Sequence, residues 1–306
     1  MRAAPPVIHH PAFRAEMPAG HRFPMDKFSR LASVLEAEGV PGPGGFVRPE
    51  PVDVETLRLV HTEAYVRGVI ELSLPAEVVR RIGMPNTDSV ATRARAATGG
   101  TILAARLALD HGIACNTAGG SHHAAADSGA GFCVFNDVAV AARRLQAEGL
   151  VGQVLVVDLD VHQGDGTARI FEDDPSVFTF SMHAEKNFPH RKATSDLDIE
   201  LADGTGDEPY LEKLGTVLPD LLAAVRPDLV FLNAGVDPHA DDKLGRLSLS
   251  DEGLRRREAL VLGACLSSEI PVVGVIGGGY DADIDRLAGR HAILHRTAKS
   301  LCSSDN

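Results

Sequence analysis

Short apolar runs alternate with longer segments of helical periodicity through most of the chain. The apolar runs predict strands at residues 112–117, 153–161, 177–182, 228–236 and 271–276. The segments with helical spacing predict helices at residues 92–110, 134–148, 209–225 and 250–268. Runs such as QVLVVDLDV at 153–161 are apolar on both faces, as parallel strands are when helices cover both sides of a sheet.

This alternation predicts an α/β fold, a single domain over residues 1–306 with a mainly parallel β-sheet flanked by helices on both faces. The PGPGG segment at 41–45 is the strongest loop signal, but too few residues precede it for a separate domain. In such sheets ligands bind beyond the carboxyl ends of the strands. Polar residues gather at three of these ends, at 158–162, 233–237 and 277–280.

Composition narrows the class of protein. The chain has 306 residues, of which 44 % are hydrophobic and 24 % charged, a mixture that permits a large core. The net charge of -12 disfavours a nucleic-acid-binding surface. The four cysteines form no C-x-x-C pair, as expected for thiols in a reducing compartment. No apolar stretch reaches the length of a membrane span, and the N-terminal segment lacks the apolar core of a signal peptide. We therefore expect a cytoplasmic protein without nucleic-acid or membrane partners.

The first chemical motif is the DLDVHQGDG segment at 158–166. If the strand continues through it, Asp158, Asp160 and His162 point to the same side, because alternate residues of a strand share a face. Two carboxylates and an imidazole in one place repel or compete unless a cation compensates them, and Zn²⁺ accepts both kinds of ligand. Asp237 ends another apolar run and can reach the same edge, whereas Asp241 and Asp242 are interpreted as loop charges.

Two glycine-rich motifs follow the same logic. GGSHH at 119–123 places His122 and His123 on a loop, where Asp158 and Asp165 are the carboxylates available to orient the rings. GGGY at 277–280 has neither the lysine nor the spacing of a phosphate-binding loop. It indicates close approach of the Gly278 and Gly279 backbone to a substrate.

Together these residues resemble the histone deacetylase family, which has the arginase–deacetylase fold. The blocks that carry the resemblance, in chain order, are residues 21–27, GGSHH at 119–123, GAGFCVFND at 129–137, VDLDVHQGDGT at 157–167, FSMH at 180–183, NAGVD at 233–237, LGRLSLS at 244–250 and GGGYD at 277–281. They span nearly the full chain in the family's order. Gln163 and the LG-x-LSLS segment are most similar to the class IV branch.

The resemblance implies a role for each matching residue. The implied zinc ligands are Asp160, His162 and Asp237. The implied catalytic residues are a general base and acid, a second histidine, their two carboxylates and a carbonyl-polarising tyrosine: His123, His122, Asp165, Asp158 and Tyr280. A structural K⁺ site is implied at Asp158, Asp160, His162, Ser181 and Met182, mostly through backbone oxygens. Gly131 and Phe132 match tunnel-lining positions, and Lys27 stands where many relatives have an arginine that lines an internal acetate cavity. No residue matches the acidic rim residue that grips the substrate, and 186–195 has no secure match.

The resemblance implies hydrolysis of an acyl amide by metal-activated water, with Fe²⁺ as an alternative to Zn²⁺. The substrate remains open between acetyl- or fatty-acyl-lysine, an acetylpolyamine and another small acyl amine, and the oligomeric state is not indicated. An arginase-type hydrolase with two Mn²⁺ ions is disfavoured because Gly164 stands where the second metal requires a carboxylate. A non-catalytic acyl-lysine-binding module is the other alternative, although such a protein has no need of His123 and Tyr280.

Overall fold

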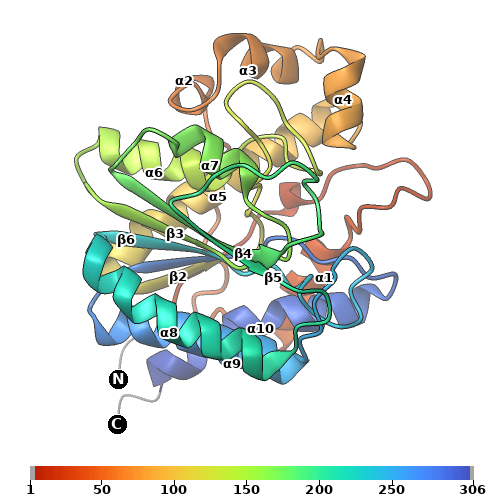
Figure 1. The fold of residues 1–306 in the computed structure, drawn as a ribbon. Helices are drawn as coiled ribbons and strands as arrows, with labels where there is room; N and C mark the ends of the chain where they lie inside the picture. The colour runs from red at the N-terminus through yellow and green to blue at the C-terminus, as the bar shows by residue number, and fades with distance from the viewer. Residues whose placement is uncertain (1–3, 304–306) are drawn as a thin grey trace.

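The computed structural model describes residues 4–303, which form one parallel sheet between two layers of helices (Figure 1). All neighbouring strands are parallel, in the order β1-β2-β7-β6-β3-β4-β5. The strands are β1 (Val7–Ile8), β2 (Ile113–Asn116), β3 (Val154–Asp158), β4 (Val177–Ala184), β5 (Leu197–Leu201), β6 (Leu229–Asn233) and β7 (Val272–Val275). The predicted α/β class is confirmed.

The helices divide between the two faces of the sheet (Figure 1). One face carries α5 (Asp88–His111), α6 (Asp137–Ala147) and α7 (Asp165–Phe171), with α2 (Val54–Leu57), α3 (Glu63–Ile70) and α4 (Ala76–Ile82) outside them. The other face carries α1 (Lys27–Ala37), α8 (Asp207–Val225), α9 (Asp251–Ser267) and α10 (Ile284–Ser303). A short 3₁₀ helix, η1, spans Pro11–Phe13. The central strands are therefore shielded from water on both sides.

Local signals explain where the predicted helices begin and end. The Thr87 hydroxyl accepts a hydrogen bond from the Val90 N–H at the start of α5, and Gly112 ends this helix with a φ of +82°. The Ser250 hydroxyl caps α9 in the same way, by accepting from the Gly253 N–H at 3.0 Å. Both boundaries agree with the sequence prediction within a few residues.

The predicted strands 153–161 and 228–236 are too long. β3 ends at Asp158 and β6 at Asn233. Beyond these residues the side chains bond to the backbone in place of the ladder, as where Asp158 Oδ1 accepts from the Asp160 N–H at 3.2 Å. The apolar run therefore continues past the strand and packs in the core, because Leu159 and Val161 are fully buried.

Strand register brings the polar ends together. Asp158 lies opposite Ser181 of β4 and Asn233 of β6. The carboxyl ends of β2, β7, β6 and β3 are neighbours, so the loops that follow them share one edge of the sheet. Within residues 4–303 no disulfide joins the four buried cysteines, and none of the described helices is long and apolar enough to cross a membrane.

Candidate active site

Three buried side chains form a cluster at this edge of the sheet. Ligand atoms of Asp160, His162 and Asp237 all lie within 4.8 Å of one another. His162 Nδ1 is 3.0 Å from Asp160 Oδ1 and 3.2 Å from Asp237 Oδ2. The structure therefore brings together the three residues expected to bind zinc, two of them following β3 and one following β6.

Asp158 does not join the cluster, so the expectation that it points the same way as Asp160 and His162 is wrong. β3 ends at Asp158, and the strand alternation on which the expectation rested ends with it. Asp158 instead accepts from His122 Nδ1 at 2.7 Å and from Asn233 Nδ2 at 2.9 Å.

Main-chain donors fix the two carboxylates of the cluster. The Gly278 N–H donates to Asp160 Oδ2 at 2.7 Å, and the Val161 N–H donates to Asp237 Oδ1 at 2.9 Å. A Cβ at Gly278 would lie 2.1 Å from Asp237 Oδ2, closer than real contacts allow. Glycine is required here because the backbone after β7 passes directly against both carboxylates.

The two histidines of the GGSHH motif each pair with one carboxylate. His122 Nδ1 donates to Asp158 and His123 Nδ1 to Asp165, both at 2.7 Å. Asp165 also accepts from Arg169 one turn along α7. Each ring therefore has its Nδ1 engaged, which leaves Nε2 as the nitrogen available for chemistry. The His–Asp pairing predicted from the sequence is confirmed.

The two paired histidines differ in charge. Burial and the neighbouring His122 together lower the pKa of His123 to about 4, against the attraction of Asp165. Burial also opposes charge on His122, but the carboxylates of Asp158 and Asp160 outweigh it and raise the pKa to about 9. At neutral pH His123 is therefore neutral and His122 is cationic.

The cluster contains two buried carboxylates, whose negative charge a bound cation can neutralise. Burial raises the pKa of Asp237, and the neighbouring Asp160 raises it further. Burial opposes charge on His162, but its bonds to Asp160 and Asp237 raise its pKa to about 10. Without a metal the site thus stabilises itself with a proton on His162. Two carboxylates and one imidazole match a catalytic zinc site, which has three protein ligands and one open position.

Tyr280 lies beside the cluster. Its ring centroid is 6.4 Å from that of His162 and 5.8 Å from that of Phe132. Burial raises the pKa of its phenol well above the ordinary value, and the carboxylates of Asp237 and Asp160 add to this effect. The hydroxyl therefore stays protonated and can donate a hydrogen bond.

A small cavity of about 30 Å³ adjoins the cluster. Its lining includes Gly131, Phe132, Gly278 and Tyr280 together with His122, His123 and Asp160. Gly279, also expected in the pocket, is not among the lining residues. Its Cα faces Val236 and His291, since a Cβ there would lie 2.5 Å and 2.8 Å from their side chains. The expectation for Gly279 therefore stays a prediction.

Two buried cationic side chains, Lys27 and Arg93, lie close to the cavity. Lys27 Nζ donates to the carbonyls of Gly277 and Gly279 at 3.3 and 3.4 Å, and burial lowers its pKa to about 8. The Arg93 guanidinium lies 4.6 Å from the Phe28 ring centroid and lines the cavity. Lys27 thus holds the GGGY loop, a contact between residues 250 positions apart that no local pattern reveals.

The sequence reasoning missed two further residues of the site. The Phe188 ring lies edge-on to His123 at 4.8 Å, and 39 % of the residue is exposed, which places it at an opening to the site. Asp242, interpreted as a loop charge, accepts a 2.6 Å bond from the Tyr280 N–H. Burial and the nearby Asp237 raise its pKa to about 7. An isolated Phe or Asp in a loop gives no signal for either role.

Fold and site together define a class of protein: a parallel α/β domain with a buried cluster of two carboxylates and an imidazole that could hold a metal ion, and two oriented histidines at the carboxyl edge of its sheet. The comparisons with known proteins agree with this class. The model of the histone deacetylase domain matches residues 21–294.

Relatives extend over most of the chain. An uncharacterized protein of Picosynechococcus sp. is 51 % identical over 296 residues, covering 97 % of this chain and 99 % of its own. Histone deacetylase 2 of Arabidopsis thaliana is 32 % identical over 269 residues, covering 85 % of this chain and 70 % of its own. The crystal structure of the HDA15 HD domain has the same fold, with a TM-score of 0.79 at 23 % identity, and covers 97 % of this chain and 89 % of that one. The chain belongs to the histone deacetylase family.

Proposed function

We propose that this protein is a zinc-dependent deacylase that hydrolyses an acyl amide with a short acyl group. Membership in the histone deacetylase family supports hydrolysis of an amide bond as the reaction. The observation that carries the proposal is the convergence on one cavity of the Asp160–His162–Asp237 cluster, the His123–Asp165 pair and Tyr280.

Asp160, His162 and Asp237 are the residues that would hold the metal. When bound, Zn²⁺ supplies polarisation of the acyl carbonyl and acidification of a water molecule to a pKa near about 7. Fe²⁺ accepts the same nitrogen and oxygen donors. The Gly278 and Val161 N–H groups hold the two carboxylates so that their remaining oxygens face the cluster.

His123 is the proposed general base and acid. Its Nδ1 is fixed by Asp165, so Nε2 takes the proton from the attacking water and later returns it to the leaving amine. The burial of both partners prevents bulk water from competing for these bonds.

His122 and Tyr280 stabilise developing charge. The His122–Asp158 pair holds a second ring, at 4.1 Å from that of His123. The Tyr280 hydroxyl donates to the oxygen that becomes negative as the carbonyl is attacked. Two residues shield the His123 ring. Gly131 packs against it on one side, and Phe188 contacts it edge-on.

The size of the cavity supports a short acyl group. A water molecule requires roughly 10–15 Å³ of such space. The 30 Å³ cavity therefore holds about as much as two waters, enough for an acetyl methyl and too little for a fatty acyl chain. Phe23, Phe28 and Arg93 are among the residues that bound this cavity.

Two finer predictions from the sequence remain proposals. The K⁺ site fits the register of β3 and β4, which sets Asp158 beside Ser181, with Met182 as the next residue. The class IV placement has the support of Gln163, whose amide donates to the Ala193 carbonyl and to Asp198, both at 2.9 Å.

Release of free amine from acyl-lysine peptides of increasing chain length, from acetyl to myristoyl, tests the proposal. We expect turnover of the acetyl peptide, its loss with a chelator, its return on addition of zinc, and at least tenfold lower kcat/KM for the octanoyl and myristoyl peptides. Preference for a long chain would overturn the short-acyl proposal. Turnover that persists after complete removal of metal would overturn zinc dependence.

A further inference from the structure

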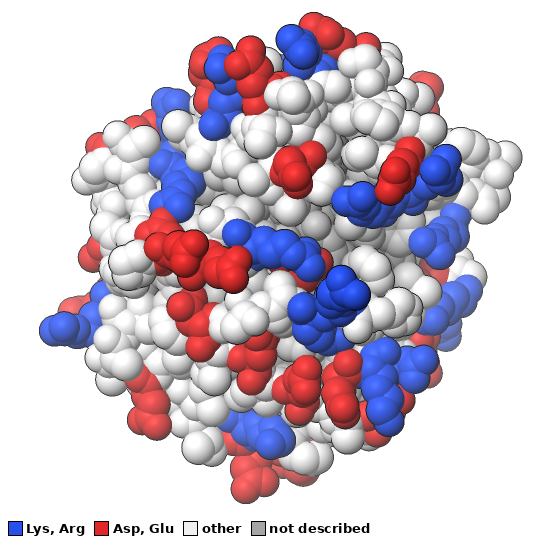
Figure 2. Space-filling view, turned by 45° about the horizontal axis from the view of Figure 1, so that its top comes forward, with Lys and Arg blue, Asp and Glu red and all other residues white. Residues whose placement is uncertain are grey.

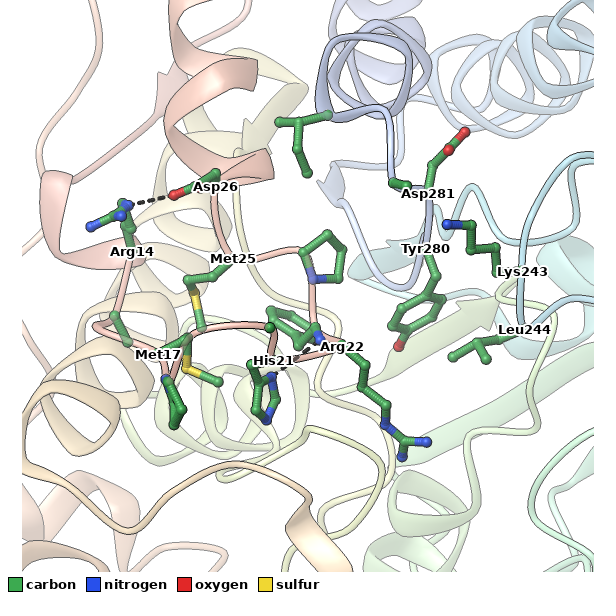
Figure 3. A pocket seen from close by; sticks show the side chains of 17 residues that line it. Arg14, Met17, His21, Arg22, Met25, Asp26, Lys243, Leu244, Tyr280 and Asp281 are labelled. Atoms are coloured by element: carbon green, nitrogen blue, oxygen red, sulfur yellow. Dashed lines mark hydrogen bonds and ion pairs between the residues drawn. The ribbon is translucent and has the colours of Figure 1, made fainter.

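A hollow of about 540 Å³ opens beside Tyr280 (Figure 3). It lies between the loop 14–26 and the two segments 243–244 and 280–284. Tyr280 and Phe23 line both this hollow and the small cavity at the Asp160–His162–Asp237 cluster. A substrate whose acyl group occupies the small cavity can therefore place another part of itself here.

Most of the charges in the hollow are already paired. Arg14 Nε donates to Asp26 at 2.7 Å. Asp281 accepts from Arg286 Nε at 2.7 Å, and Arg290 lies 3.3 Å from the same carboxylate. These groups offer no unbalanced charge to a ligand.

The His21 ring is also engaged on both nitrogens. Its Nδ1 accepts from the Phe23 N–H at 3.1 Å, and its Nε2 donates to the Gly83 carbonyl at 3.0 Å. Both ring nitrogens are therefore occupied, and His21 offers neither of them to a ligand.

Two cations remain, Arg22 and Lys243. Both are exposed, and within residues 4–303 neither lies within salt-bridge distance of a carboxylate. The Arg22 guanidinium is 4.8 Å from the centroid of Phe132, which lines the small cavity. Lys243 donates its N–H to the Tyr280 carbonyl at 3.1 Å, so its backbone is fixed beside that tyrosine. In the view of Figure 3, Tyr280 lies between these two side chains, with the Arg22 guanidinium and the Lys243 ammonium on opposite sides of it.

We propose that the amine portion of the substrate carries a carboxylate, which lies in this hollow and pairs with Arg22 or with Lys243. The inference rests on the proposed deacylase function. Arginine and lysine are the natural partners of a carboxylate, and Met17, Met25 and Pro24 give the remaining lining an apolar character suited to the carbon chain between the carboxylate and the amide. The carboxylate belongs either to a free N-acyl amino acid or to an acidic side chain near an acyl-lysine in a peptide.

The same two cations disfavour an acetylpolyamine, whose free amines are positive. The attraction to the carboxylate is local, since the chain as a whole carries a net charge of -12. Acidic and basic side chains are interspersed over the face that Figure 2 shows, with no wide field of either sign. The recognition is therefore expected to weaken with salt, as it does for exposed ion pairs.

Matched probes that differ in one charge test the inference. Nε-acetyl-lysine is compared with its C-terminal amide, an acetyl-lysine peptide with a neighbouring Glu with its Gln counterpart, and N-acetylputrescine serves as the cationic probe. In the wild-type protein we expect KM to be about threefold lower for one or both carboxylate probes than for their neutral partners, the size expected of one exposed ion pair. We expect the weakest binding for N-acetylputrescine.

The double variant R22Q/K243Q should bring the ratio of KM values close to one. Arg246→Gln is the matched control, because Arg246 is exposed, lies outside the hollow and pairs with Asp203 at 3.0 Å. It should leave the ratio unchanged. A ratio of one in the wild-type protein for both pairs, or an unaltered ratio in R22Q/K243Q, would overturn the inference. If only the Glu and Gln peptides differ in KM, the carboxylate comes from an acidic side chain of a peptide. If only Nε-acetyl-lysine and its amide differ, it comes from a free N-acyl amino acid.

A binding measurement separates this inference from the proposed function. Calorimetric Kd values for the same probes are compared in His123→Ala and in His123→Ala with R22Q/K243Q. Absence of amine release from every probe in the wild-type protein, with a Kd ratio of about three in His123→Ala that disappears in the combined variant, would defeat the deacylase function and support the carboxylate site. Equal Kd values for the acid and neutral probes would defeat the carboxylate site whatever the turnover.

Discussion

The Arg257 guanidinium reaches from α9 to the backbone of the active site, where its Nη1 donates a 3.0 Å hydrogen bond to the carbonyl of Leu159. Leu159 stands between Asp158, which orients His122, and Asp160 of the metal cluster. Arg257 is fully buried and pairs with the equally buried Glu258 at 2.5 Å. One buried ion pair thus fixes the backbone on which two site carboxylates depend.

Loss of Arg257 should therefore destabilise the protein strongly. Arg257→Met removes the bond to Leu159 and leaves the Glu258 carboxylate buried without its partner, which typically costs about 3–5 kcal/mol. We expect a drop of this size in the free energy of unfolding measured with denaturant. The double variant Arg257→Met/Glu258→Gln should recover part of the loss, because no unpaired charge remains. A single variant as stable as the wild type would contradict this account.

Tyr280→Phe should abolish most turnover and leave the metal in place. The hydroxyl is the proposed donor to the developing oxyanion, and removal of one such donor lowers kcat on the order of a hundredfold or more. The ring stays, so its contacts with Phe132 and Phe23 should persist. Amine release and zinc content are measured on the same preparation. Turnover at the wild-type rate would remove Tyr280 from the mechanism.

Asp237→Ala should abolish tight zinc binding. Asp237 supplies one of three ligands, and the two remaining residues both come from the segment after β3. Zinc per chain is measured by elemental analysis after dialysis. Asp241→Ala is the matched control, because Asp241 is exposed, and its buried partner Arg290 keeps a second carboxylate, that of Asp281. One zinc per chain in Asp237→Ala would refute the ligand assignment.

Because of Lys27, the free energy of unfolding of the metal-free protein should change with pH in the alkaline range. Burial lowers the pKa of Lys27 from 10.5 to about 8, so between these values the unfolded chain binds more protons than the folded one. The free energy of unfolding should therefore rise with pH over this interval, by up to about 3 kcal/mol at roughly 1.36 kcal/mol per pKa unit.

Denaturant titrations at the two ends of that interval, in the presence of a chelator, measure the effect. Lys27→Met should remove this contribution and flatten the pH dependence relative to the wild type. Lys213→Met, which changes an exposed residue of α8, should keep the wild-type slope. An identical slope in Lys27→Met and the wild type would show that burial of this ammonium has no energetic consequence.

The central sheet and the chemistry at its edge could be predicted from the sequence, because β3, β6 and β7 are short runs apolar on both faces that end in polar residues. β1 could not, because two residues carry no period. β5 was not predicted either. Its LDIEL pattern alternates over only five residues, and the strand lies at the edge of the sheet beside a polar loop.

Residues that act through tertiary contacts escaped prediction for a related reason. Arg257 and Asp242 have side chains that usually face water, and only the folded chain shows that both are withdrawn from it. Phe188 belongs to a loop without periodicity, so its contact with His123 follows from the path of the chain alone.

The Asp160–His162–Asp237 cluster lies just beyond the ends of two strands, β3 and β6, which are direct neighbours in the middle of the sheet. Asp160 follows β3 by two residues and Asp237 follows β6 by four, so ladder hydrogen bonds set the spacing between their anchor points. No hinge or domain boundary separates the ligands. The centre should therefore be preorganised, with little reorganisation to oppose ion capture. When the protein is unfolded by heat or denaturant, metal binding and the β-sheet should be lost together in one cooperative step.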